Sequence, residues 1–178
     1  DYSVKKGTRA IKLNYINEPL IRNDLIKFID YAKKKGIIDI YLSTNGILLK
    51  KELSKKLINS GLTRIQVSID AYTQETYDKV RPGGNLKNII ENVNNFLQLR
   101  NDSNLQIPLL RVNFVKTELN EFELDQFIDF WKDKVDMIGV QEFIEPTKVS
   151  SQIKSSKTIK KKAFKCSFRF KKLVINNE

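Results

Sequence analysis

The chain has 178 residues, 40% of them hydrophobic, and a formal net charge of +11 at pH 7. This length can bury one substantial core, so we expect one folded domain, and the lack of an apolar run of about 18 residues excludes a membrane-spanning helix. The absence of histidine and the single cysteine, Cys166, exclude Ser–His and Cys–His chemistry and an internal disulfide.

The lone cysteine favours a reducing, cytoplasmic setting. The first residues, Asp1 to Val4, contain neither an initiator methionine nor the apolar stretch of a signal peptide. We therefore expect the sequence to be the interior of a longer protein.

Apolar residues alternate along the chain between the spacing of strands and that of helices. Five strand-like runs are expected at 11–16, 37–43, 64–70, 109–115 and 137–143. This alternation predicts consecutive right-handed crossovers and a mainly parallel sheet.

Helical spacing fills the stretches between these runs, with apolar residues at 25–32, 50–60, 86–97 and 124–131. Gly36 and Gly61 are expected to end the first two helices. Asn120 and Glu123 stand three residues apart before the last helix, which predicts a capping box there.

Several of the expected strands have one polar face. In the run 64–70, Ile65, Val67 and Ile69 alternate with residues that are all polar: Arg64, Gln66, Ser68 and Asp70. Parallel strands covered by helices on both faces are almost continuously apolar, and so is the interior of a closed eight-stranded barrel. The pattern therefore predicts a wider, incomplete barrel with a lumen for a polar ligand. An antiparallel sheet with one wet face would alternate likewise, but the intervening helices count against it.

Three of these runs end in short polar segments that contain Glu18, Asn45 and Asp70, at intervals of 27 and 25 residues. Each interval is about the length of one strand, one helix and two loops. The carboxyl ends of parallel strands meet at one rim, where α/β proteins bind ligands. The spacing therefore predicts a polar small-molecule site at that rim.

Four motifs follow one another in order: Asn-Glu-Pro-Leu at 17–20, Ser-Thr-Asn-Gly at 43–46, Val-Ser-Ile-Asp-Ala at 67–71 and Glu-Thr-Tyr-Asp-Lys-Val-Arg at 75–81. In this order they resemble the central part of radical S-adenosylmethionine (SAM) enzymes, closest to the branch with a C-terminal, cysteine-rich SPASM extension. The resemblance covers about residues 9–143. It implies an α/β fold, a partial (β/α)6 radical-SAM-type barrel, of which this chain would cover about five βα units.

The resemblance also implies two cofactors, SAM and a four-iron four-sulfur cluster held by a CxxxCxxC loop that is absent from this sequence. Glu18 matches the glutamate of the family's Gly-Gly-Glu motif, which contacts the amino group of SAM, although Asn17 replaces the preceding glycine. A carboxylate suits an ammonium group because it only accepts hydrogen bonds. Further cofactor contacts are implied for Thr44, Asn45, Gly46, Ser68, Asp70, Arg81, Asn113 and Gln141.

These implied contacts differ in kind. Thr44, Asn45 and Gly46 would lie beside the adenosyl group, whereas Ser68 and Asp70 would reach the ribose hydroxyls or the methionyl group. Arg81 would meet the SAM carboxylate, and the inward registers of the last two strands supply Asn113 and Gln141. The alternative interpretation of each single motif is ordinary turn chemistry, since Asn-Gly and Asp or Thr starts are common in loops.

The positive charge is concentrated at the C-terminal end, where residues 148–178 hold ten basic residues and one acidic residue. We expect a barrel over 1–147 and a basic linker over 148–163, because no aromatic residue interleaves the Lys/Ser run for base stacking. Residues 164–178 resemble the start of the SPASM extension, which would make Cys166 a metal ligand. One thiolate cannot hold a cluster that needs about four, so we expect this piece alone to be inactive.

The leading hypothesis is a radical SAM enzyme whose reduced cluster cleaves SAM to a 5′-deoxyadenosyl radical. Its substrate would be unknown, a peptide or protein being one option, and its electron donor a flavodoxin or ferredoxin. A non-catalytic nucleotide or nucleic-acid binding module that uses the basic C-terminal segment is the alternative, with nucleic acid less favoured than a linker role for that segment. A barrel enzyme using Asp70 or Glu18 as acid or base without iron is a third.

Overall fold

The structure is a computed structural model, and it describes residues 2–14 and 17–143. The expected linker, the SPASM-like segment and Cys166 lie outside these residues. Five parallel strands form one sheet in the order β1-β2-β3-β4-β5, so each strand pairs with its neighbours in the sequence. The strands are β1 (Ala10–Lys12), β2 (Asp39–Thr44), β3 (Arg64–Ser68), β4 (Leu109–Lys116) and β5 (Met137–Glu142).

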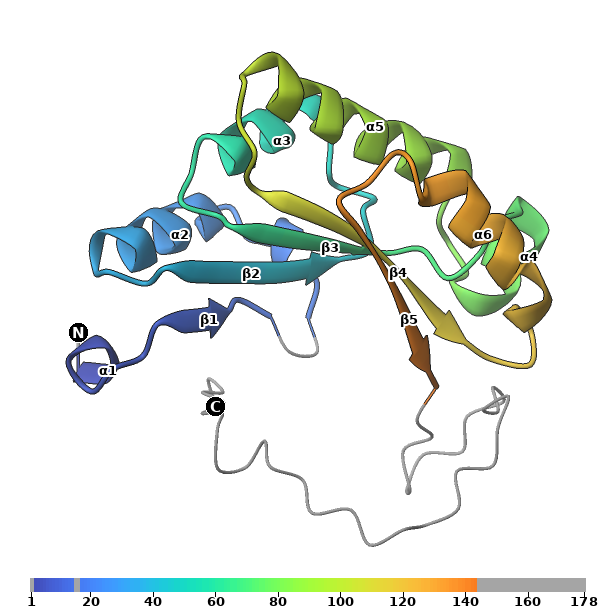
Figure 1. Cartoon of the computed structure of the whole chain (residues 1–178), viewed down its shortest axis with the longest axis horizontal. Coiled ribbons are helices and arrows are strands. Elements are labelled where there is room, and N and C mark those ends of the chain that lie inside the picture. The colour runs from blue at the N-terminus through green and yellow to red at the C-terminus, as the bar shows by residue number, and fades with distance from the viewer. Residues whose placement is uncertain (1, 15–16, 144–178) are drawn as a thin grey trace, which may run out of the picture.

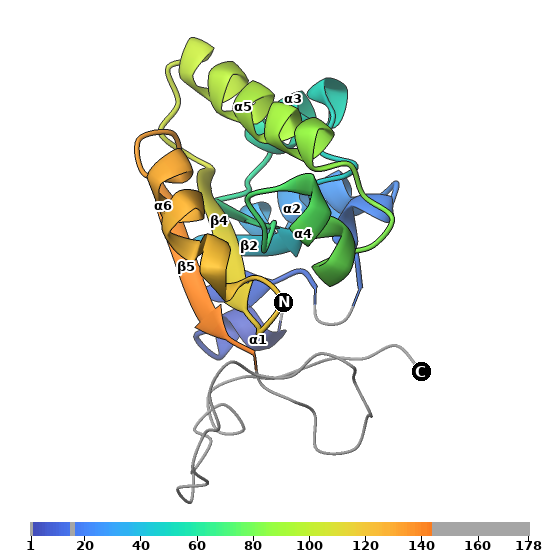
Figure 2. The same cartoon turned by 90° about the vertical axis from the view of Figure 1, so that its right-hand side faces the viewer.

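This arrangement confirms the α/β fold class and the parallel sheet expected for a partial barrel. The helices that connect the strands lie on one side of the sheet (Figure 1). In the view turned by 90°, α5 lies above the strands (Figure 2). The helical elements are α1 (Tyr2–Lys5), a 3₁₀ turn (Pro19–Ile21), α2 (Leu25–Lys34), α3 (Lys51–Ile58), α4 (Gln74–Val80), α5 (Leu86–Asp102), a second 3₁₀ turn (Glu121–Glu123) and α6 (Leu124–Trp131).

The core fills the space between the sheet and these helices. The strand residues that face the helices are fully buried: Ile40, Leu42, Ile65, Val67, Leu110, Val112 and Phe114. From the helices, Ile29, Leu57, Phe96 and Phe127 meet them with no exposed surface. Burying each such side chain contributes about 1.5–3 kcal/mol, so this layer anchors the strands whose ends carry the polar motifs.

The capping box expected at 120–123 is wrong. Asn120 makes no side-chain cap for the turn that follows it. Glu123 instead accepts hydrogen bonds from the backbone N–H groups of Tyr72 and Thr73 and from the hydroxyls of Thr73 and Thr76. Its carboxylate therefore holds the segment just before α4, the helix whose N-cap is Thr73. The apolar spacing did not predict α4, because its buried residues are Thr76 and Tyr77.

A helix long and apolar enough to cross a lipid bilayer is absent from the part of the chain that the structure describes.

Candidate functional site

Glu18 joins the loops that follow β1 and β2. One carboxylate oxygen accepts the Leu20 N–H at 3.0 Å and the Thr44 hydroxyl at 2.8 Å, and the other accepts the Asn45 N–H at 2.8 Å. A carboxylate has about four acceptor positions, so these three donors leave one for a ligand. The predicted residues Glu18, Thr44 and Asn45 thus lie together at the carboxyl rim.

Gly46 lets the chain turn sharply out of β2. Its φ of +80° lies in the left-handed region, and a β-carbon there would overlap Val67 and press on Ile89. The side chain of Asn92, on α5, donates to the Gly46 carbonyl at 2.9 Å and holds the turn from outside. The rim position of Gly46 therefore depends on close packing as well as on the turn.

Asp70 is 5% exposed and occupies the end of the segment after β3, with φ of +62°. One of its oxygens accepts the Val115 N–H at 2.7 Å, and the other accepts Arg81 Nε at 2.6 Å. Asn120 donates to the carbonyls of both Asp70 and Val115, at 2.8 and 2.9 Å. Burial raises the pKa of Asp70, against the opposing effect of the Arg81 charge and of the hydrogen bonds.

The two acidic predictions therefore differ in their surroundings. Glu18 keeps an acceptor position open, whereas the Asp70 carboxylate is buried and held by two protein donors. Arg81, whose side chain is 31% exposed, is fixed by this ion pair and still has N–H groups available at the rim. We therefore assign Asp70 to positioning Arg81.

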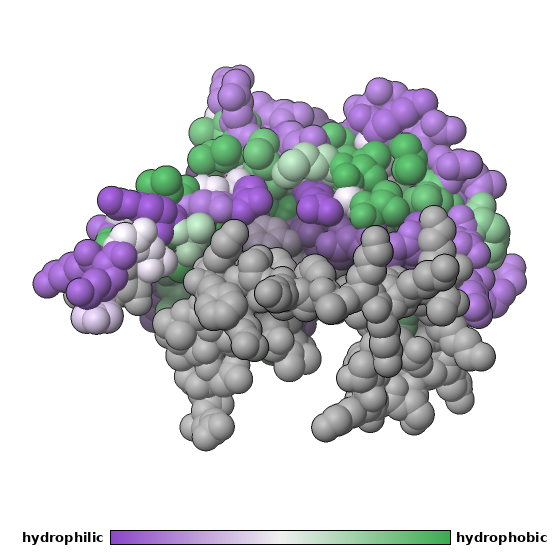
Figure 3. All heavy atoms as spheres, turned by 60° about the horizontal axis from the view of Figure 1, so that its bottom comes forward, coloured by the Kyte–Doolittle hydropathy of each residue, from purple (hydrophilic) through white to green (hydrophobic). Residues whose placement is uncertain are grey.

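The sheet face away from the helices carries a row of polar side chains. The Tyr41 hydroxyl donates to Gln66 at 2.8 Å, and the Gln66 amide lies 3.4 Å from the Ser43 hydroxyl. On the neighbouring strands Asn113 donates to Gln141 at 3.3 Å, as expected from their inward registers. Figure 3 brings this side of the molecule forward and shows hydrophilic residues beneath a band of hydrophobic ones.

Cations surround the Tyr41 ring on this polar face. Lys12 Nζ lies 5.5 Å from the ring centroid and Arg64 Cζ lies 5.1 Å from it. Arg64 also forms a two-pronged bond with Asp39, and this hydrogen-bonded carboxylate raises the pKa of Arg64.

Arg111 lies on the same face and was not predicted as a site residue. Its Nη2 lies 3.3 Å from the Asn113 amide oxygen, and its Nε is buried without a hydrogen-bond partner among the described residues. The sequence could have pointed to Arg111, because it occupies an inward position in a strand that contains no acidic residue. Together with Lys12 and Arg64, Arg111 gives this face three cationic side chains, of which Arg64 is paired with Asp39.

The residues present fit SAM but not the cluster. The open acceptor position of Glu18 suits an ammonium group, and the Arg81 N–H groups suit a carboxylate. By contrast, residues 2–14 and 17–143 hold no group of three His, Cys, Asp or Glu side chains that would bind a metal ion. The one cysteine of the sequence, Cys166, lies outside these residues, and one thiolate does not supply the roughly four ligands of a cluster.

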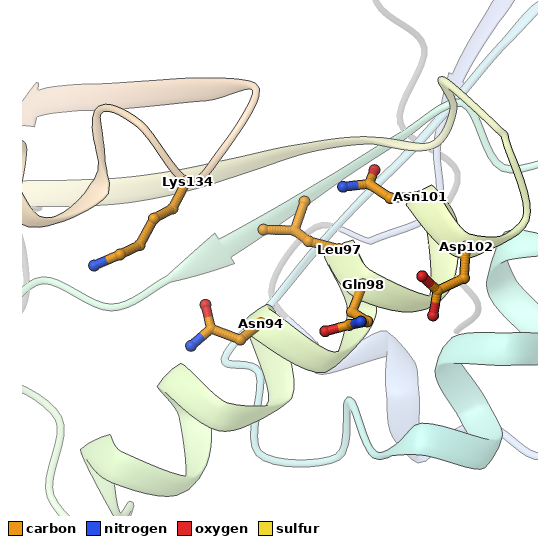
Figure 4. A pocket seen from close by; sticks show the side chains of 6 residues that line it. All are labelled: Asn94, Leu97, Gln98, Asn101, Asp102 and Lys134. Carbon is orange, nitrogen blue, oxygen red and sulfur yellow. The ribbon is translucent and has the colours of Figure 1, made fainter.

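Two hollows occur on the helical side, away from the rim. One, of about 390 Å³, runs along α5 and is lined by Asn94, Leu97, Gln98, Asn101, Asp102 and Lys134 (Figure 4). The other, of about 420 Å³, is lined by Gln74, Leu86, Lys87, Ile90 and Glu91. Neither contains a predicted site residue, so the candidate site is the rim together with the polar face of the sheet.

Comparison with known proteins gives a family match. The model of the radical SAM superfamily matches residues 4–122. The probable GTP 3′,8-cyclase of Methanocaldococcus jannaschii is 33% identical over 142 residues, which cover 80% of this chain and 45% of that protein. The GTP 3′,8-cyclase of Alkaliphilus oremlandii is 33% identical over 119 residues, 66% of this chain and 35% of that one.

Among solved structures, Streptococcus suis SuiB bound to S-adenosylmethionine superposes with a TM-score of 0.60 at 19% identity. The match covers 78% of this chain and 30% of SuiB, and at this identity it supports the fold alone. The chain spans less than half the length of the curated relatives it matches.

Proposed function

The chain belongs to the radical SAM superfamily, and on that premise we propose that the full-length protein is an enzyme that binds SAM at this rim and cleaves it reductively. The observation that carries the proposal is the Glu18 carboxylate, which joins two rim loops and keeps one acceptor position for the SAM ammonium group. A four-iron four-sulfur cluster bound beside SAM would supply the electron that breaks a carbon–sulfur bond of SAM, which would release methionine and leave a carbon-centred radical for hydrogen abstraction. The cluster ligands would come from sequence outside this chain.

The rim residues of this chain would bind and orient SAM. Arg81, held by Asp70, offers N–H donors to the SAM carboxylate, and a charge-assisted pair of this kind is about twice as strong as a neutral hydrogen bond. Thr44, Asn45 and Gly46 would border the adenosyl group. Ser68, Asn113 and Gln141 would offer hydroxyl and amide groups to the ribose from the polar face.

A nucleoside triphosphate is the substrate class that we favour. The relatives named above are GTP 3′,8-cyclases, and the polar face places Lys12, Arg64 and Arg111 around Tyr41. Arg64 is paired with Asp39, and the buried Nε of Arg111 has no hydrogen-bond partner among residues 2–14 and 17–143. A guanidinium binds two phosphate oxygens through parallel N–H donors, so the arginines of this face suit a polyphosphate.

The other interpretations are supported less well. A peptide substrate and a SPASM extension rest on the residue pattern around Cys166, which lies outside the described residues. A nucleic-acid binding module would rest on basic residues at 148–178, whereas the family match covers 4–122. An electron donor such as a flavodoxin or ferredoxin is part of the proposal because reductive cleavage requires one electron.

Anaerobic reconstitution of the full-length protein with iron and sulfide tests the proposal. We expect a brown protein that converts SAM, given a reductant, to methionine and 5′-deoxyadenosine, and that consumes GTP in preference to peptide pools. The present chain treated identically should bind no stoichiometric cluster. A full-length protein with intact cysteines that stays colourless and leaves SAM uncleaved would overturn the proposal.

A further inference from the structure

The stretch from 117 to 131, which contains the second 3₁₀ turn and α6, is acidic in a strongly basic chain. It holds five acidic residues and no basic one, whereas the whole chain has a formal net charge of +11. Three of these acidic residues, Glu118, Glu121 and Asp125, are exposed and form no ion pair with any residue among 2–14 and 17–143. This local excess of negative charge suits a cationic partner.

Apolar side chains stand among these carboxylates. Phe122 is 69% exposed and Leu119 is 38% exposed, although other residues of α6 are buried in the core. Tyr72, 41% exposed, lies close by, because its backbone N–H donates to the carboxylate of Glu123 at 2.7 Å. Exposed apolar groups that gather in one patch and are bordered by polar residues mark interaction sites. The acidic α6 surface is the name that we give to this patch, which consists of Glu118, Leu119, Glu121, Phe122 and Asp125.

The basic C-terminal residues follow from a point beside this surface. Phe143, the last described residue, donates its backbone N–H to the Lys116 carbonyl at 3.1 Å, so it lies next to the start of the acidic stretch. β4 and β5 are parallel, and α6 lies beside them (Figure 1). Lys157 follows Phe143 by 14 residues, and a flexible chain of this length spans about 20 Å. Because α6 is only about 12 Å long, the whole surface is within reach of the lysines that follow β5.

We propose that the acidic α6 surface is the docking site for residues 153–164 of the same chain. This segment contains five lysines, no acidic residue and three large apolar residues, Ile153, Ile159 and Phe164. It therefore complements the surface in charge and in apolar character. Single exposed ion pairs are weak, but the tether raises the local concentration of the segment to the millimolar range, so several such pairs suffice. Docking returns the chain to the rim and fixes the position of the residues that follow 164.

Zero-length cross-linking of the full-length protein tests the docking. A carbodiimide condenses a carboxylate and a lysine amine that are in contact into an amide, and mass spectrometry of the digested protein identifies the two residues. We expect links within one molecule between the lysines of 153–164 and the carboxylates of Glu118, Glu121 and Asp125. Their yield should decrease as salt is added, because exposed charges are screened over about 8–10 Å.

A charge exchange makes the test specific. Glu121→Lys combined with Asp125→Lys should lower the yield of links to Glu118 about twofold to 30-fold, the factor that two exposed ion pairs are worth. Adding Lys160→Glu and Lys161→Glu to that variant should restore links, now between the exchanged positions. Glu52→Lys combined with Asp102→Lys makes the same change of net charge at exposed positions of α3 and α5. This control should leave the links to the acidic α6 surface unchanged.

Three results would overturn the inference. The first is a parent protein in which no lysine of 153–164 is linked to the surface. The second is links that join two molecules, which would assign the surface to a second copy of the chain. The third is a yield that the two surface substitutions leave unchanged, or that the control lowers equally. The docking does not depend on SAM, so links in a protein that leaves SAM uncleaved would overturn the proposed function alone.

Discussion

The two faces of the sheet are built from alternate residues of the same strands, yet they have opposite kinds of contact. Toward the helices, side chains such as Leu42, Val67 and Phe114 are fully buried in close packing. On the other face, Gln66 lies 3.4 Å from Ser43, and Asn113 lies 3.3 Å from both Arg111 and Gln141. These are long hydrogen bonds, unlike the 2.8 Å bond from Tyr41 to Gln66 and the Arg64–Asp39 pair on the same face. The groups that make the long bonds are the ones a ligand can engage at little cost.

Stability and ligand binding are therefore separated between the two faces of the sheet. Apolar packing holds the strands in register, and the resulting rigid sheet carries polar groups that do little for folding. A substitution on one face should therefore change the free energy of unfolding, and one on the other should change ligand affinity.

The largest expected effect comes from two neighbouring residues on opposite faces of β2. Leu42→Ala leaves a cavity in the core and should lower the free energy of unfolding by about 2–5 kcal/mol. Ser43→Ala removes a half-buried hydroxyl that accepts a long hydrogen bond from Gln66, at 3.4 Å, and should lower it by less than about 0.5 kcal/mol. Urea denaturation of both variants measures their free energies of unfolding. Equal losses would contradict the conclusion that the helix-facing side of the sheet carries the stability.

Glu18→Ala tests whether the rim binds SAM. Loss of the carboxylate should weaken SAM binding by about 1.5–3 kcal/mol, the value of a hydrogen bond to a charged group. Equilibrium dialysis with labelled SAM gives the affinity, and Asp24→Ala, which removes a carboxylate exposed beside Arg22, is the control. Unchanged SAM affinity in Glu18→Ala would count against the assignment of the rim.

Two buried carboxylates should respond to pH in opposite directions. Burial raises the pKa of Asp70, so the stability that wild type gains over Asp70→Asn should decrease as pH rises from the unfolded value through the folded pKa. For Glu123, burial acts to raise the pKa, but hydrogen bonds from Thr73, Tyr72 and Thr76 together lower it. Its advantage over Glu123→Gln should be present above the unfolded pKa and be lost as pH falls through the folded one.

Thermal unfolding of the two variant pairs between pH 3 and pH 7 measures these slopes. Slopes of the same sign would contradict the prediction that burial dominates the pKa of Asp70 and hydrogen bonds dominate that of Glu123.

Added salt should change the affinity for SAM at the rim very little and should clearly weaken the binding of tripolyphosphate to the polar face. SAM carries both charges of an amino acid beside its sulfonium, so its affinity should change little between low and moderate salt. Tripolyphosphate attracted by Lys12, Arg64 and Arg111 should bind more weakly as salt screens the charges over about 8–10 Å. Equal salt dependence for both ligands would mean that they share one subsite.

The order of elements could be predicted from the sequence, because strand and helix periodicity are local properties of a backbone that repeats every two or 3.6 residues. The five strands begin within two residues of their predicted starts, and the spacing of Glu18, Asn45 and Asp70 placed them at the strand ends. Asn113 and Gln141 were expected at inward registers of the last two strands, and in the structure they contact each other at 3.3 Å.

Only the tertiary structure decided which partner each polar side chain takes. Glu123 binds the backbone of Tyr72 and Thr73, about 50 residues earlier in the chain, rather than capping its own helix. Asp70 turns toward Arg81 and Val115, and Arg111 uses the space that Gly139 leaves in the next strand. The physical reason is that hydrogen bonds and ion pairs depend on distances of about 3 Å between residues remote in sequence, which the packing of helices on the sheet sets and periodicity does not encode.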